Sequence, residues 1–168
     1  MASTTSTLAP LPILGIDHLK IPTSSLTAKL AFYTTILPFK HLPHFDHRHP
    51  ASPSSDASST PGKGELFAVI LQHAPTGLLL ELRHHPTQAA AQRGWDAVTW
   101  SVATRADLEA WRTALVERGV ECSKVLKGLK GWVLVAEDPD GAFVRWYCKE
   151  THEWDENVDT DQRWLPWL

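Results

Sequence analysis

The chain has 168 residues, of which 43% are hydrophobic, and a formal net charge of −3. This length is enough for one compact domain or two small fused modules. Because the sequence has no basic block, nucleic acid is excluded as an expected partner, and no apolar run reaches the roughly 18 residues that a membrane-spanning helix needs. Residues 1–12 are rich in Ser, Thr and Pro and lack the pattern of a signal or transit peptide. We therefore expect a flexible N-terminal tail on a cytoplasmic protein.

The first half of the chain predicts one strand, one helix and three further strands. Residues 14–21 alternate between apolar and polar positions, which indicates a strand that ends at Pro22. Ser24 or Ser25 can cap the following helix, whose apolar positions recur at helical spacing as far as Leu37. The further strands are expected at residues 39–45, 65–72 and 78–83.

Residues 46–63 interrupt this pattern. They contain His47 and His49 among many Pro and Ser residues, and they have too little apolar content to pack. We predict that this segment is a mobile insertion.

The second half repeats the same order of elements. Residues 95–102 predict a strand, and Thr104 with Asp107 three residues later resembles a capping box at the start of a helix. That helix is expected to end at Gly119. Three more strands are expected at residues 120–126, 132–136 and 142–148. The tail, residues 150–168, is acidic and holds three tryptophans, so we expect it to dock on the body of the protein or on a second subunit.

Several short phrases occur in the order and spacing of a known family. They are Gly15-Ile16-Asp17-His18, its altered repeat Gly94-Trp95-Asp96-Ala97, Phe32-Tyr33, Leu37-Pro38-Phe39, Leu79-Leu80-Glu81-Leu82 and Asp138-Pro139-Asp140-Gly141. Together they resemble the vicinal-oxygen-chelate superfamily, which includes glyoxalases, bleomycin and fosfomycin resistance proteins and extradiol dioxygenases. The resemblance implies an α+β fold over residues 13–149. Its two β-α-β-β-β modules, residues 14–84 and 94–149, would form a cup-shaped mixed sheet with helices on the outer face.

The resemblance also implies where a metal would bind. In this family the ligands come from the first and last strands of each module, which places them at His18, Glu81, Ala97 and Arg145. Ala97 has no donor atom, and Arg145 carries a permanent positive charge. Because a divalent metal usually takes three or four protein ligands, His18 and Glu81 leave the site incomplete, and Arg145 opposes it by charge repulsion.

Few residues could replace the missing ligands. Asp96 and His84 are close in sequence, but strand alternation points both side chains to the other face. His47 and His49 lie on the predicted insertion, which could fold over the cup. Two cofactor alternatives therefore stay open: no cofactor, or a divalent metal held with substitute ligands.

A site without a metal is the main alternative. His18 and Glu81 would then act as an acid–base pair for proton transfer. Strand alternation adds further side chains to the cup, which we expect to bind the substrate: Arg145, Lys20, Arg83, Thr99, Tyr147 and Trp95. Arg145 in particular would hold an anion through its planar guanidinium. The opposing interpretation is structural, with Glu81 and Arg145 forming a buried ion pair.

Three functions follow from these alternatives, and a fold does not choose among them. The first is a lyase-, isomerase- or cyclase-type enzyme that acts on a small anionic or aromatic organic molecule. The second is a protein of the bleomycin-resistance type that sequesters a ligand without turnover. The third is a metal-dependent lyase or dioxygenase with substitute ligands. In each case we expect a homodimer with a small-molecule ligand and no nucleic acid or membrane partner.

Overall fold

The computed structural model describes residues 14–50 and 64–165. The predicted N-terminal tail, residues 1–12, and most of the predicted insertion, residues 46–63, lie outside these ranges. Within them, no helix is long and apolar enough to cross a membrane.

The first module forms one mixed sheet covered by a helix. Its elements are β1 (His18–Thr23), α1 (Leu26–Thr35), β2 (Phe39–His41), β3 (His47–Arg48), β4 (Leu66–His73) and β5 (Leu79–His84). The strand order is β1-β5-β4-β2, with β3 also paired to β4. β1 runs parallel to β5, and the other pairs are antiparallel. Ser25 caps α1 as predicted, because its hydroxyl accepts the N–H of Ala28 at 3.3 Å.

The second module repeats this arrangement after a short connecting helix. Its elements are α2 (Pro86–Ala91), β6 (Asp96–Val102), α3 (Arg105–Glu117), β7 (Leu126–Lys127), β8 (Gly131–Glu137) and β9 (Phe143–Thr151). The strand order is β6-β9-β8-β7, with β6 parallel to β9. The predicted capping box is present, since Thr104 and Asp107 exchange hydrogen bonds at the start of α3.

Three elements differ from the sequence-based expectations. The strand expected over residues 39–45 ends at His41, and a single 3-10 turn follows from Pro43, which has no N–H to donate to a sheet. The strand expected over residues 120–126 is reduced to β7 and one isolated bridge between Cys122 and Ala136. The helix α2 was not predicted, although Pro86 at its first turn is a typical helix-start signal.

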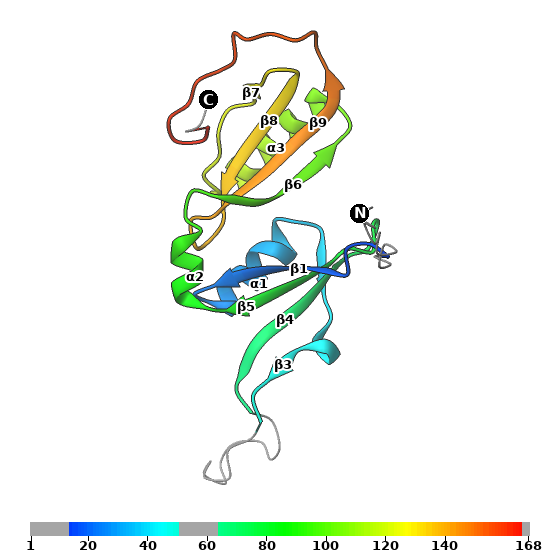
Figure 1. Ribbon diagram of the computed structural model, residues 1–168, viewed down its shortest axis with the longest axis vertical. Coiled ribbons are helices and arrows are strands. Elements are labelled where there is room, and N and C mark those ends of the chain that lie inside the picture. The colour runs from blue at the N-terminus through cyan, green and yellow to red at the C-terminus, as the bar shows by residue number, and fades with distance from the viewer. Residues whose placement is uncertain (1–13, 51–63, 166–168) are drawn as a thin grey trace, which may run out of the picture.

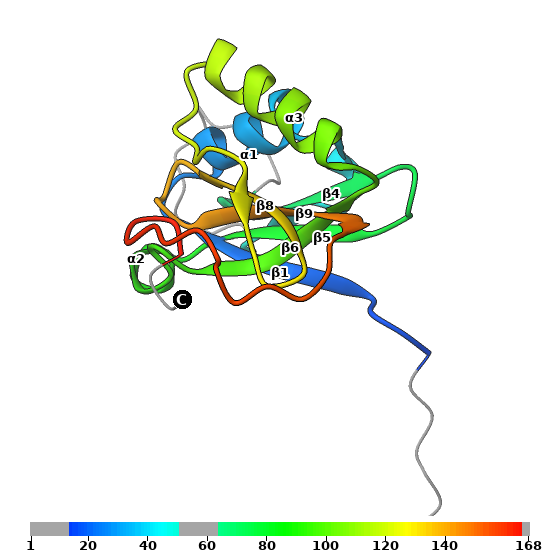
Figure 2. The ribbon, with the colours of Figure 1, turned by 90° about the horizontal axis from the view of Figure 1, so that it is seen from above.

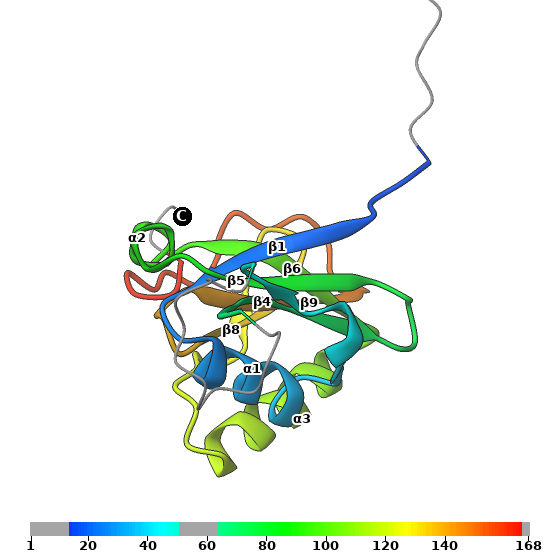
Figure 3. The same cartoon turned by 90° about the horizontal axis from the view of Figure 1, so that it is seen from below.

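The two modules share one layered arrangement. β1 and β6 are the strands at the facing edges of the two sheets (Figure 1). Helices α1 and α3 lie on the same side of both sheets (Figures 2 and 3). One apolar core joins the modules on this side, and it includes Phe32 and Leu80 from the first and Leu108 and Trp146 from the second. The opposite side of the sheets is therefore free to carry polar groups.

The C-terminal segment docks on the body of the protein. Trp164 and Leu165 are buried against Val135 and Phe143, on the side of the second sheet that faces away from α3 (Figure 2). The rings of Trp164 and Phe143 lie 5.3 Å apart. Of the two locations expected for this tail, the structure shows the first, and the tail fills part of the surface that the sequence analysis expected to be open.

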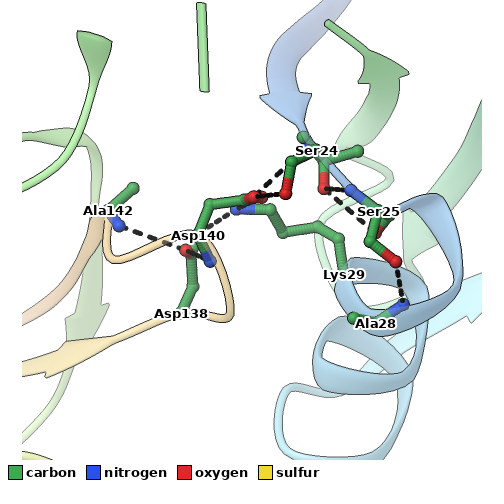
Figure 4. A network of polar contacts seen from close by, with 8 residues as sticks. Ser24, Ser25, Ala28, Lys29, Asp138, Asp140 and Ala142 are labelled. Atoms are coloured by element: carbon green, nitrogen blue, oxygen red, sulfur yellow. Dashed lines mark hydrogen bonds and ion pairs between the residues drawn. The ribbon is translucent and has the colours of Figure 1, made fainter. Parts of the chain in front are cut away.

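A buried cluster of charges ties the two modules together (Figure 4). Lys29 on α1 is fully buried, and its Nζ contacts Asp138 and lies 2.9 Å from Asp140 Oδ2. Both aspartates belong to the turn between β8 and β9. Asp138 Oδ1 also accepts the N–H of Asp140 at 2.9 Å and that of Ala142 at 3.2 Å. The turn thus does more than reverse the chain, because its carboxylates neutralise a lysine of the other module.

The two carboxylates respond differently to this environment. Burial raises the pKa of Asp138 above its ordinary value, and the Lys29 charge offsets only part of that rise. Burial also acts to raise the pKa of Asp140, but hydrogen bonds from Ser24, Lys29 and Thr23 lower it to about 2. The Ser24 backbone N–H donates to Asp140 Oδ1 at 3.0 Å.

Replacing Lys29 should destabilise the whole fold. Lys29→Met would leave two carboxylates buried without their cation, which typically costs about 3–5 kcal/mol. Urea denaturation followed by circular dichroism measures this loss, and Lys40→Met, at an exposed position on β2, is the matched control. A loss of about 1 kcal/mol or less, as for an exposed pair, would contradict the inferred role.

The low pKa of Asp140 predicts a pH dependence of the free energy of unfolding. Because its pKa is lower in the folded than in the unfolded chain, the ionised carboxylate stabilises the fold above about pH 4, and this contribution is lost as the pH falls to about 2. Asp140→Asn should therefore cost on the order of 2 kcal/mol more at pH 5 than at pH 2. Denaturation of both proteins across this range measures the difference, with the exposed Glu109→Gln as control. An equal cost at both pH values would refute the assignment.

Candidate functional site

Four titratable side chains from β1 and β5 meet on the face of the first sheet that points away from α1. In the parallel pairing of these strands, Lys20 lies beside Glu81. Leu80 and Leu82 point into the core, so alternation turns Glu81 and Arg83 to the opposite face. His18 joins them from the start of β1. The sequence analysis expected these four residues to share a face, and the structure brings them together.

Glu81 is the centre of this cation cluster, which we define as His18, Lys20, Glu81 and Arg83. Arg83 Nε donates to Glu81 Oε1 at 2.5 Å. Lys20 Nζ and His18 Nε2 each lie 3.5 Å from Glu81 Oε2. The Glu81 side chain is 3% exposed, whereas those of His18, Lys20 and Arg83 are 38%, 48% and 36% exposed. The carboxylate therefore lies beneath three groups that reach solvent, and it holds them in place.

The other ring nitrogen of His18 also has an acidic neighbour. His18 Nδ1 lies 2.7 Å from Asp17 Oδ2, and Asp17 is exposed. The imidazole is thus oriented by carboxylates at both ends. The sequence analysis did not assign a role to Asp17, because residues adjacent on a strand usually point to opposite faces.

A small cavity adjoins the cation cluster. Its volume is about 230 Å³, and its lining includes Lys20 and Arg83 on one side and Gln88 and Gln92 on the α2 side. The sequence analysis missed both glutamines because it did not predict α2. Among the described residues, the charged side chains that line this cavity are both cations. The cavity therefore offers positive charge and amide groups together.

The second module carries its own ion pair. Arg145 Nη2 lies 2.9 Å from Asp96 Oδ1, and the Thr99 hydroxyl donates to Asp96 Oδ2 at 3.4 Å. The expectation that Asp96 points away from Arg145 was wrong, because the pairing of β6 with β9 shifts register between Asp96 and Thr99. Such a bulge breaks the alternation on which the expectation rested. The ion pair expected between Glu81 and Arg145 is not formed, since each finds its partner within its own module.

The remaining predicted substrate-binding residues lie apart from the cation cluster. Tyr147 packs against the apolar cluster that Trp164 and Leu165 complete. Trp95, just before β6, is 56% exposed, and Thr99 is exposed on β6.

The donor set does not fit a divalent metal. Of the four positions that the family pattern supplies, only His18 and Glu81 carry donors, and Glu81 Oε2 already lies 3.5 Å from the Lys20 ammonium. Within residues 14–50 and 64–165, no group of three or more His, Cys, Asp or Glu side chains could hold a metal ion. Cations of the protein surround the carboxylate that a metal would need, so no chemical step is derived through a metal here.

Comparisons with known proteins agree with this architecture. The model of the Glyoxalase/Bleomycin resistance protein/Dioxygenase superfamily matches residues 15–145. No curated protein sequence matches the chain.

Among solved structures, the fosfomycin resistance protein FosX from Listeria monocytogenes is 12% identical, with a TM-score of 0.60 over 83% of this chain and 96% of that one. The antibiotic binding protein TnmS3 from Streptomyces sp. CB03234 is 18% identical, with a TM-score of 0.60 over 84% of this chain and 100% of that one. A domain of the same family from Frankia sp. EAN1pec is 20% identical, with a TM-score of 0.57 over 83% and 100%. At these identities the likeness shows a shared fold.

Proposed function

Because the chain belongs to the glyoxalase/bleomycin resistance protein/dioxygenase superfamily, we propose that it binds a small organic anion on its open sheet face without a metal. The anionic group would lie against Lys20 and Arg83, in the cavity beside α2. The observation that carries this proposal is a single buried carboxylate, Glu81, that holds three solvent-reaching cationic groups at the edge of a cavity.

Arg83 is well placed to receive an anion. Glu81 contacts its Nε, so the guanidinium is fixed in orientation while its two terminal nitrogens can donate to a ligand. Lys20 adds a mobile point charge from the neighbouring strand. Charge-assisted hydrogen bonds from both groups favour a carboxylate or a phosphonate. Gln88 and Gln92 would contact polar atoms next to the charged group.

The second module would hold the organic part of the ligand. Thr99 and Trp95 are exposed near the facing edge of that sheet. Arg145 and Tyr147 complete this proposed wall, although Asp96 already balances the charge of Arg145. An anion is therefore expected at Lys20 and Arg83 rather than at Arg145.

Known neighbours are consistent with this ligand class. FosX has been solved with Mn(II) and a dihydroxypropylphosphonic acid, and TnmS3 is an antibiotic binding protein. Among these two modes, the donor set of this chain favours the binding protein. Glu81 is too deeply buried to reach a ligand, so we infer a positioning role for it.

One observation favours a second candidate function, proton transfer by His18. Its Nδ1 is held by Asp17 at 2.7 Å, and its ring is partly exposed beside Lys20. An imidazole oriented by a carboxylate is a common general base. An enzyme of lyase or isomerase type would use His18 in this way and the two cations to hold the substrate.

The binding proposal predicts a loss of affinity when either cation is removed. Arg83→Gln and Lys20→Gln should each weaken binding of phenylphosphonate by about tenfold, since each removes one charge-assisted contact. Isothermal titration calorimetry in the presence of EDTA measures this change. Arg112→Gln, at an exposed position on α3, is the matched control. Equal affinity of all four proteins would overturn the proposal.

His18→Asn separates binding from turnover. A binding protein should keep phenylphosphonate affinity within about threefold, because His18 lies outside the cavity that Lys20 and Arg83 line. Nuclear magnetic resonance of the ligands that the wild type binds should show no conversion over hours. Conversion by the wild type that is lost in His18→Asn would establish the enzyme instead.

A further inference from the structure

A second and larger cavity lies on the other side of the sheets. This inter-module cleft has a volume of about 550 Å³ and includes Phe39 and His73 from the first module and Trp100, Trp111 and Trp146 from the second. Its volume is within the range of about 300–1,000 Å³ that is typical of small-molecule sites. Neither the family match nor the binding site proposed above accounts for it.

The orientation of the rings separates the cleft from the cation cluster. Trp100 and Trp146 are neighbours across the β6–β9 pairing. The Trp146 ring lies 5.2 Å from that of Trp111 on α3, so both strand tryptophans face the helices. Glu81 and Arg83 face the opposite side of the sheets. A ligand in the cleft would therefore not contact the proposed anion site.

The rings form a nearly continuous aromatic wall. Phe39 joins the two modules, with its ring 5.4 Å from that of Trp100 and 5.4 Å from that of His73. Trp146, at the base, is only 2% exposed. Rings at these separations leave faces and edges on which a flat ligand can stack.

The polar content of the cleft is low. In the part of the chain that the structure describes, none of the lining residues is Asp, Glu, Lys or Arg. His73 Nδ1 lies 2.8 Å from the Thr76 hydroxyl, which fixes the ring in the wall of the cleft. Because an ionised ligand would lose its hydration here without gaining a charged partner, the lining selects against ions.

We propose that the inter-module cleft binds a neutral, flat aromatic molecule. The occupant is inferred from the match between an uncharged aromatic lining and an uncharged aromatic ligand. This site is independent of the anion site, so that the failure of one proposal leaves the other standing.

The test uses N-phenyl-1-naphthylamine, a neutral aromatic fluorophore, with the full chain. The three cleft tryptophans should transfer excitation energy to the bound probe and give a saturable titration with one probe per chain. The sulfonated relative 1-anilinonaphthalene-8-sulfonate should bind at least about fivefold more weakly, because its charge has no partner in the cleft.

Two variants locate the bound probe. Trp111→Leu removes one ring and should weaken binding by about fivefold, whereas Trp154→Leu, at an exposed tryptophan outside the cleft, should leave it unchanged. Thr76→Phe, at an exposed turn on the rim, should weaken binding by narrowing the entrance. Melting curves confirm that each variant is folded, and Arg83→Gln should bind the probe as the wild type does.

Three results would overturn the proposal. One is the absence of saturable binding to the wild type. Another is binding that folded Trp111→Leu and Thr76→Phe proteins both retain in full. The third is binding that appears only after deletion of residues 1–13, because the segment that precedes Ile16 at the rim would then be the occupant of the cleft.

Discussion

The buried contact of Lys29 with Asp138 and Asp140 is the constraint on which the arrangement of the two modules depends. Taking three charges out of water is costly, and the cost is offset only when all of them remain together. α1 packs on the first sheet, and the turn with the aspartates joins two strands of the second. The contact therefore fixes the position of one module relative to the other, and with it the walls of the cleft where Phe39 meets Trp100.

This constraint gives the molecule two different surfaces. The side of the helices is apolar and aromatic, and it carries a cleft without formal charge in the described residues. The opposite side carries the cation cluster around Glu81, while the tail residues Trp164 and Leu165 cover part of the second sheet. A family fold that offers metal positions has here been filled with side-chain cations, so positive charge remains at the site although the donor set no longer fits a metal.

Local patterns predicted much of the fold, and non-local contacts explain what they missed. The capping box at Thr104 and the alternation that placed Lys20 and Arg83 beside Glu81 depend only on neighbouring residues, and both are confirmed. The contact of Asp96 with Arg145 depends on a bulge, which a regular strand pattern does not indicate. The burial of Lys29 depends on carboxylates more than 100 residues away, and a lysine on a helix is expected to be exposed.

The most direct test of metal-independent anion binding is a crystal structure of the phenylphosphonate complex grown with Mn²⁺ present. The account predicts phosphonate oxygens within hydrogen-bond distance of Lys20 Nζ and the Arg83 guanidinium, with no ion between His18 and Glu81. A Mn²⁺ ion that bridges His18, Glu81 and the phosphonate would contradict it, because the three cationic groups would then have moved away from the carboxylate that holds them.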